Sequence, residues 1–201
     1  MPTWSSGLLP GVVALTWAAA LAAAQGPDRP LTLPTGDVAV VYRFEGVGED
    51  IPHKLLVTYT GQGERVRIDY FRFFEAKSPY LSLIFDRPAN RVISLHPESR
   101  SYLDRPIGTA ANPGAMLPLD ADFTRLGQAV VAHAQCIDWM VTNRDKPEDR
   151  ATACVTEDGI MLRLASTKPK VVTLTATEIH YGPPAAGLFD LPPKFTREAL
   201  P

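Results

Sequence analysis

The sequence has few of the residues from which active sites and metal centres are built. It contains two cysteines and four histidines, and no two histidines stand close enough along the chain to form a metal-ligand pair. No Gly-x-Ser-x-Gly segment, the mark of a hydrolase nucleophile, occurs. Its Gly-x-Gly pairs at 46–48 and 61–63 lack the third glycine and the following helix of a phosphate-binding loop. These absences predict a protein that is not an enzyme and that uses neither a metal nor a cofactor.

An excess of positive charge is also missing. The formal net charge is −2, with 20 basic and 22 acidic residues. Proteins that bind nucleic acid or an anionic membrane surface concentrate lysine and arginine. The charge balance therefore gives no reason to expect either partner.

An uncharged apolar run at residues 8–24 ends in Ala22-Ala23-Ala24, the small-x-small pattern that a signal peptidase accepts. The run is too short, and too interrupted by Pro10 and Gly11, to cross a membrane comfortably. We therefore expect residues 1–24 to be a cleaved signal peptide, although no lysine or arginine precedes the run, and an uncleaved anchor or a buried helix remain alternatives. No cysteine follows the run, which excludes a lipoprotein anchor. The predicted location is the periplasm, with a Pro-rich leading segment at 25–34 and one domain at 35–201.

The two cysteines flank a loop of turn residues at 143–149. Cys136 and Cys154 are each nine residues from Asp145, so folding the segment about that residue places them directly opposite one another. Disulfides persist in oxidising compartments. The spacing predicts a cross-strand disulfide Cys136–Cys154 in an exported protein, in agreement with the signal peptide.

Alternation of apolar and polar residues dominates the chain beyond the leading segment. In Arg65–Tyr70, Val66, Ile68 and Tyr70 share one face and the charged residues share the other, as in a half-buried strand. Short links between consecutive strands indicate antiparallel meanders. The expected strands are 37–44, 53–60, 65–70, 80–85, 91–95 and 101–103 in a first meander, and 130–142, 151–156, 160–165 and 171–181 in a second.

Two turn signals in the second meander predict the same core face. Asp158-Gly159 indicates a two-residue hairpin turn, which pairs Val155 with Leu162. The cysteine symmetry independently pairs Ile137 with Ala153. Together they place on one face Ile137, Trp139, Val141, Ala153, Val155, Leu162 and Leu164, and on the other Cys136, Cys154 and Arg163.

Residues 105–119 interrupt the strands with three prolines and two glycines, which indicates a lid or binding loop. Residues 120–126 are expected to form one or two helical turns, capped by Asp120 or Asp122 and ended by Gly127. The predicted fold class is mainly β (α+β): a strongly curved antiparallel meander sheet, or open half-barrel, with one or two short helices.

Several segments of the C-terminal half resemble a known group of envelope proteins. These segments are 123–127, 131–132, 136–139, 153–163, 181–184 and 188–192. They resemble uncharacterised proteobacterial envelope proteins related to the LolA/LolB-like half-barrel superfamily, which sorts lipoproteins. The resemblance implies an open half-barrel whose concave apolar face, covered by helices and a loop, holds acyl chains. Three features depart from that pattern: His133 replaces a frequent glycine, the cysteine pair is unusual, and the helical lid is poorly represented.

The aromatic run at 70–74 carries the candidate binding residues. Alternation sends Phe71 and Phe73 to the face opposite Tyr70, so both faces of this strand bear rings. Packing in the core is one interpretation, and lining of an apolar cavity closed by the irregular loop is the other. The candidate ligand-binding residues are Tyr70, Phe71, Phe73, Met116, Leu117 and Trp139.

These features predict a non-catalytic exported protein that binds an apolar moiety, such as a lipid or a lipidated protein, on the concave sheet face. The alternative is a protein–protein interaction module with a filled core, in which the convex face or an edge strand docks an envelope partner. An empty cavity beneath residues 105–119 would favour the first function. A packed interior would favour the second.

Overall fold

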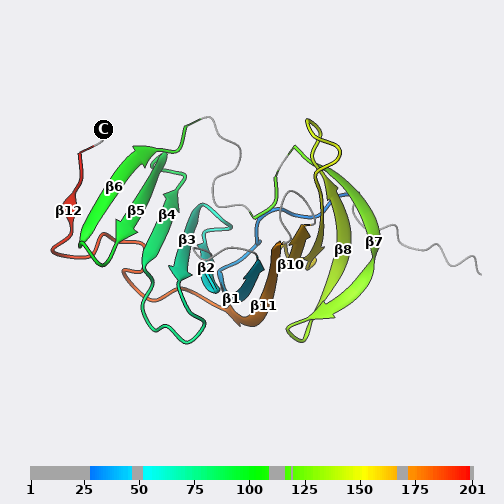
Figure 1. Ribbon diagram of the computed structural model, residues 1–201, viewed down its shortest axis with the longest axis horizontal. Coiled ribbons are helices and arrows are strands. Elements are labelled where there is room, and N and C mark those ends of the chain that lie inside the picture. Colours follow the sequence, from blue (N-terminus) through cyan, green and yellow to red (C-terminus); the bar gives the residue numbers. More distant parts are fainter. Residues whose placement is uncertain (1–27, 47–51, 109–115, 119, 167–171, 200–201) are drawn as a thin grey trace, which may run out of the picture.

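The computed structural model describes residues 28–46, 52–108, 116–118, 120–166 and 172–199. These residues form one open sheet of twelve strands, and none of them is helical. The order across the sheet is β12-β6-β5-β4-β3-β2-β1-β11-β10-β9-β8-β7. Figure 1 shows the sheet bending strongly along this order. The mainly antiparallel, unclosed sheet that the sequence predicts is therefore confirmed.

The sheet consists of two meanders joined through β1 and β11, and we call them the first and second wings. The first wing comprises β1 (Val38–Gly46), β2 (Lys54–Thr60), β3 (Arg65–Phe71), β4 (Leu81–Asp86), β5 (Arg91–His96), β6 (Ser101–Pro106) and the short β12 (Thr196–Arg197). The second wing comprises β7 (Asp122–Val131), β8 (Ala134–Thr142), β9 (Arg150–Val155), β10 (Met161–Ser166) and β11 (Val172–Tyr181).

One face of both wings carries a continuous apolar core, and we call it the inner face. Val40 of β1 lies opposite Val57 of β2, which in turn lies opposite Ile68 of β3. In the second wing, Trp139 of β8 belongs to the same buried cluster and is 1% exposed. The curved sheet thus closes its concave side around side chains from both halves of the chain.

Tyr42 fastens the two wings at their junction. Its hydroxyl donates a 2.6 Å hydrogen bond to the carbonyl oxygen of Met161, at the start of β10. Burial, and secondarily the neighbouring Tyr59, raises the pKa of Tyr42 well above its ordinary value. The phenol therefore stays neutral and able to donate.

The outer face of the first wing is covered by the chain that follows β11. Arg67 of β3 pairs with the buried Asp69 at 2.9 Å and donates a 2.6 Å hydrogen bond to the carbonyl oxygen of Leu188. Phe189 and Phe195 of this tail pack against a second small core. That core is made of Ile84, Ile93 and Leu95. The tail then runs to β12, which pairs in parallel with β6 (Figure 1).

The predicted helix at 120–126 is wrong, because Asp122–Leu126 form the first half of strand β7. The predicted single strand at 130–142 is also wrong, since the chain reverses at Ala132-His133 between β7 and β8. Both turn residues have a positive φ, 49° and 62°, as a type I′ hairpin turn requires. Alanine and histidine give no sequence signal for such a turn.

The disulfide is confirmed, but the predicted register is wrong by two residues. Cys154 lies opposite Asp138, and Ile137 lies opposite Val155 rather than Ala153. The bridge therefore joins diagonal neighbours across β8 and β9. A shift of two residues preserves side-chain alternation, so the residues of β8 and β9 keep their predicted faces.

The hairpin between β9 and β10 has three loop residues rather than the predicted two. The N–H of Gly159 donates a hydrogen bond to the carbonyl oxygen of Thr156. The N–H of Thr156 in turn donates to the carbonyl oxygen of Ile160. Gly159 has a φ of +89°, and a Cβ there would lie 2.2 Å from the carbonyl oxygen of Leu33. The position therefore requires glycine for two reasons: its conformation and the close approach of the leading segment. A further bulge near Leu162 makes Val155 pair with Met161 instead of Leu162, whereas the pair Ala153–Leu164 is as predicted for this turn.

Candidate functional site

Strand β7 forms an edge of the sheet. Among the described residues it pairs only with β8. Seven of its ten residues are exposed, so both of its faces meet solvent over most of its length. Its register shifts between Arg125 and Gly127, which leaves Leu126 as an extra residue in a bulge. An edge strand with this exposure offers unpaired backbone donors and acceptors.

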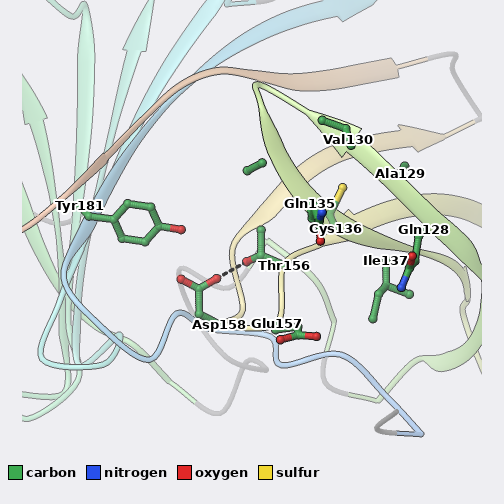
Figure 2. A pocket seen from close by; sticks show the side chains of 11 residues that line it. Gln128, Ala129, Val130, Gln135, Cys136, Ile137, Thr156, Glu157, Asp158 and Tyr181 are labelled. Carbon is green, nitrogen blue, oxygen red and sulfur yellow. Dashed lines mark hydrogen bonds between the residues drawn. The ribbon is translucent and has the colours of Figure 1, made fainter. Parts of the chain in front are cut away.

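A cavity of about 550 Å³ lies at the end of the sheet, beside the second half of β7 (Figure 2). One wall is the β7–β8 hairpin, another is the turn at 157–159, and Tyr181 at the end of β11 points toward it. The lining residues are Gln128, Ala129, Val130, Ala134, Gln135, Cys136, Ile137, Thr156, Glu157, Asp158 and Tyr181. None of them is basic, and two are acidic.

Asp158 is the best-anchored polar group of this cavity. The Thr156 hydroxyl donates to its carboxylate, and its carbonyl accepts from the N–H of Thr35 at 2.9 Å. Partial burial, and then the charge and hydrogen bond of Asp158, raises the pKa of Tyr181 above its ordinary value. Tyr181 is therefore a neutral hydrogen-bonding side chain, whereas Glu157 is exposed and makes no described hydrogen bond or ion pair.

Two exposed apolar side chains, Val130 and Tyr181, line the cavity, and a third, Leu126, lies farther along the β7 edge. Leu126, Val130 and Tyr181 are 51%, 67% and 64% exposed. They are three of the six large apolar side chains that the described residues expose. Contiguous exposed apolar surface marks interaction sites more often than single exposed residues do. The end of the second wing is therefore the candidate binding surface.

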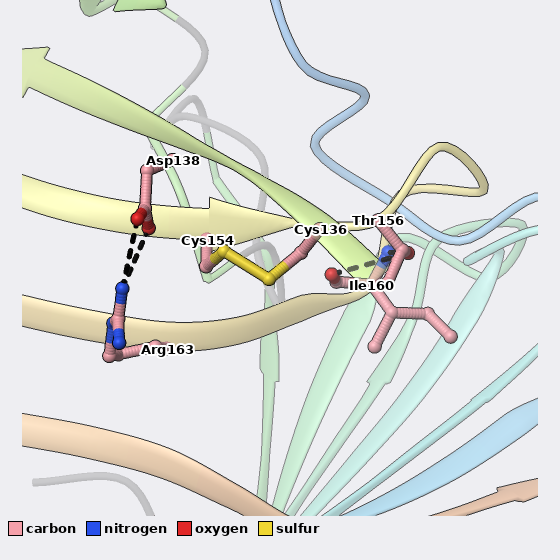
Figure 3. Close-up of a disulfide and its surroundings, with 6 residues drawn as sticks. All are labelled: Cys136, Asp138, Cys154, Thr156, Ile160 and Arg163. Carbon is pink, nitrogen blue, oxygen red and sulfur yellow. Dashed lines mark hydrogen bonds and ion pairs between the residues drawn. A yellow bond between two sulfur atoms is a disulfide. The ribbon is translucent and has the colours of Figure 1, made fainter. Parts of the chain in front are cut away.

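Covalent and ionic links hold the strands behind this surface (Figure 3). The Cys136–Cys154 disulfide joins β8 to β9, with its Cα atoms 5.5 Å apart. Arg163 of β10 donates through Nη2 to both carboxylate oxygens of Asp138 on β8, at 2.9 and 3.0 Å. The three strands that follow β7 across the sheet, β8, β9 and β10, are therefore cross-linked to one another. This support lets β7 present a fixed backbone to a ligand.

The structure brings four of the six predicted ligand-binding residues into one cluster. Leu117 and Trp139 are buried in the inner core, at 3% and 1% exposure. Met116 and Tyr70 are half-buried and pack against the same core. Within the described residues, the indole N–H of Trp139 is buried without an acceptor. Among the described cavities, none is lined by these four residues.

The remaining two predicted residues lie elsewhere. Phe71 is buried at the opposite face of β3, with the Lys54 ammonium 4.2 Å from its ring centroid. Phe73 is 67% exposed and stacks on His53, with ring centroids 6.5 Å apart. It borders two open cavities of about 310 and 320 Å³. Neither ring shares a described cavity with Trp139.

In the described ranges, no group of three or more His, Cys, Asp or Glu side chains is arranged to hold a metal ion. His180 contacts Glu178 at 3.1 Å in an exposed pair. No described helix is long and apolar enough to cross a bilayer. The predicted signal peptide at 1–24 lies outside the described residues.

Sequence reasoning missed the edge of β7, Gln128, Val130 and Tyr181 as a binding surface. The exposed strand does not alternate, because neither face is buried over most of its length, so the periodicity that marks a half-buried strand is missing. The one available signal was Tyr181 at the end of a clear strand, next to Gly182 and two prolines.

No family model matches the chain, and no curated protein matches it. Among solved structures, an uncharacterized conserved protein from Thermus thermophilus is similar, with a TM-score of 0.56 and 11% identity over 82% of this chain and 90% of that one. MucB is similar with a TM-score of 0.51 and 11% identity, over 79% of this chain and 58% of MucB. MucB in complex with MucA(peri) gives a TM-score of 0.48 and 13% identity, over 77% and 53%.

At these identities the likeness shows the fold. MucB has a LolA-like fold, so the half-barrel fold that the resemblance implies is confirmed. The present chain spans little more than half the length of MucB.

Proposed function

We propose that the protein is a non-catalytic, exported binding protein that docks a partner protein through the exposed end of its second wing. The observation that carries the proposal is a cavity of about 550 Å³ that exposes Val130 and Tyr181, beside an edge strand that also exposes Leu126. Exposing such side chains to water is unfavourable, and covering them with a partner removes that cost.

The packing of the inner face supports a protein partner over a lipid held in the sheet. The fully buried side chains include Trp139, Tyr42, Val40 and Val57, which fill the concave side themselves. Leu117 of the irregular loop adds to the same filled core. A packed interior is the outcome expected for an interaction module, whereas an empty cavity is the one expected for a lipid carrier.

The disulfide supports an exported protein, because such bonds persist in oxidising compartments. Both cysteines are consumed in it, so neither supplies a thiolate for catalysis. The described histidines are dispersed over separate strands and loops.

Position-specific photo-crosslinking in the envelope tests this function. A photoreactive residue at Val130 should give one adduct of defined mass, and the same residue at Phe73, equally exposed on the first wing, should not. The captured protein is then purified, and its complex with the wild-type chain is reconstituted. A Val130→Lys variant should bind at least fivefold more weakly, since losing a central apolar contact removes about 1 kcal/mol or more. Equal adducts at both positions, or unchanged affinity of the variant, would refute the proposal.

A second candidate function is the holding of an apolar chain, such as an acyl group of a lipid or lipidated protein, on the inner face. The observation that favours it is the buried indole N–H of Trp139, which has no acceptor among the described residues. A buried unpaired donor is unfavourable by about 1–3 kcal/mol. The carbonyl oxygen of an acyl ester or amide would satisfy it, with Tyr70, Met116 and Leu117 around the chain.

Native mass spectrometry of protein purified from the envelope, together with binding of a fluorescent fatty acid, tests this second candidate. A co-purifying lipid, and binding that weakens in Trp139→Phe but not in Phe73→Leu, would support it. Protein that carries no lipid and binds no fatty acid would exclude it. The crosslinking result at Val130 is independent of this outcome.

A further inference from the structure

The two edges of the sheet are treated differently by the chain. At the β6 edge, β12 adds two residues in parallel, and Thr196 and Glu198 donate 2.9 Å hydrogen bonds to the carbonyls of Arg100 and Tyr102. At the β7 edge, no described segment pairs with the side of the strand that faces away from β8. The described residues thus cover one edge with an extended segment and leave the longer edge open.

We propose that the β7 edge binds an extended segment of the partner as a thirteenth strand, and that a basic side chain of this segment enters the cavity beside it. The inference rests on the proposed function and specifies how the partner is held. Backbone groups of the ten-residue strand would supply the affinity, and side-chain pockets along it would supply the selectivity, as in other cases of strand addition.

The chemistry of the cavity selects the side chain. Among the described lining residues, Glu157 and Asp158 alone are charged, while Tyr181 and Gln128 supply neutral polar groups. The neighbouring Val130 adds an apolar wall that suits the methylene stem of a lysine or arginine. Glu157 is exposed and makes no described hydrogen bond or ion pair of its own, and its carboxylate can therefore pair with an incoming cation.

The mechanical support behind β7 suits this role. Strand addition requires that the receiving strand keep its twist and register while the ligand binds. The disulfide and the Asp138–Arg163 pair fix β8 to β9 and β10, directly behind the edge (Figure 3). A segment that binds β7 therefore meets a preorganised edge.

A second copy of this chain fits the edge less well than a foreign segment does. Arg125 is the only basic residue of β7, so in a dimer it would have to enter the cavity of the other copy. Two antiparallel β7 strands achieve this only when their pairing is centred near Gly127. That register would set the two bulges at Leu126 against each other and interrupt the ladder at its centre. A regular foreign strand has to accommodate only one bulge.

Selection from a library of peptides as long as β7 tests the mode of binding. The library carries Val, Leu or Phe at alternate positions and any residue between them, and the bait is the oxidised full chain. We expect selected peptides to share a lysine or arginine at one position. The best binder is then N-methylated on its odd or on its even residues. Only alternate N–H groups of an added strand point to its neighbour, so one set should abolish binding and the other should preserve it.

A charge substitution tests the cavity. With the best peptide, Glu157→Gln should weaken binding about fivefold, the upper range for an exposed ion pair, and should remove the preference for lysine over norleucine. The matched control is Glu148→Gln, an exposed glutamate in the loop at the other end of the second wing, which should bind as wild type.

The outcomes separate this inference from the function on which it rests. Equal tolerance of both N-methylated sets, or no selected peptide, would overturn strand addition even if the crosslink at Val130 identifies a partner. Selected peptides without a basic position would overturn the role of the cavity. A concentration-dependent dimer that is dispersed by Arg125→Ala would assign the edge to a second copy and overturn the foreign segment.

Discussion

The two wings meet the same structural demand in different ways. Each is an antiparallel meander that buries one face in the common core and must stabilise its outer strands. The first wing does so with the chain's own tail, held by Arg67 and by the small core around Ile84 and Ile93. The second wing does so with a disulfide and an ion pair, and no described segment covers its edge. The covalent link stabilises the second wing without occupying its surface, so that the surface can serve for binding.

Removing the anchor of the tail gives the largest expected effect. Asp69→Ala leaves Arg67, whose side chain is 15% exposed, without its carboxylate, and breaking a pair that is largely buried lowers the free energy of unfolding by about 3–5 kcal/mol. Urea unfolding measures the loss, and hydrogen exchange should show faster exchange in residues 188–197. The control is Asp104→Ala, which removes a pair with the exposed Arg197 at 3.9 Å and should change stability by less than about 1 kcal/mol. An equal decrease in the free energy of unfolding of the two variants would contradict the role of the Arg67–Asp69 pair as the anchor of the tail.

The disulfide gives the next largest effect, in the other wing. Replacing both Cys136 and Cys154 with alanine should lower the free energy of unfolding by about 3 kcal/mol, because the unfolded chain loses a closed loop. Hydrogen exchange should accelerate in β7, β8 and β9 and stay unchanged in β4 and β5. Reduction of the wild type provides the control, since it opens the bond without changing the sequence. Uniform acceleration across both wings would show that the bond does not act locally.

Tyr42 tests how firmly the wings depend on each other. Tyr42→Phe leaves the carbonyl of Met161 without its donor and should lower stability by about 1–2 kcal/mol at neutral pH. The pKa of Tyr42 is raised in the folded state, so the unfolded chain loses its phenol proton first as pH rises. Stability from this group is therefore complete below about pH 10 and declines above it. Urea unfolding across the neutral to alkaline range should show a shallower alkaline decline in the variant, whereas an unchanged slope would contradict this role.

The smallest expected effect concerns the hairpin at the open edge. Ala132 and His133 both occupy positive φ, a region unfavourable for residues with a Cβ. Replacing them with Asn and Gly, the preferred pair for this turn, should raise the free energy of unfolding by about 1 kcal/mol. Thermal unfolding of the double variant measures the gain. A loss of stability would show that the histidine side chain contributes a contact that outweighs its backbone strain.

Sequence predicted the parts of the fold where local signals agree with burial. The alternation in Arg65–Tyr70 and the Asp158-Gly159 turn locate strands and a hairpin, and the cysteine spacing identifies the bond. It did not predict β7, where Asp120, Asp122 and Gly127 imitate helix ends and neither face is buried over most of the strand. It also did not predict the bulges, because an inserted residue changes the pairing without changing composition.

The candidate site was less predictable than the fold, for a physical reason. The predicted aromatic residues are apolar, and apolar side chains go to the interior, where Trp139 and Leu117 indeed lie. The surface that the structure exposes is made by residues whose neighbours come from distant strands. Val130, Glu157 and Tyr181 meet only after the second wing has curved. Their spacing along the chain therefore does not indicate that these residues are close together in the folded protein.

The pairing of β1 with β11 also has a consequence for the order of assembly. Val38 lies opposite Tyr181, so one side of the first strand to be synthesised finds its partner only after all the strands between them have been made. Contacts this distant in sequence slow folding, because a long loop must close before they form. During synthesis, the first meander therefore remains with that side of β1 unpaired until β11 has been made.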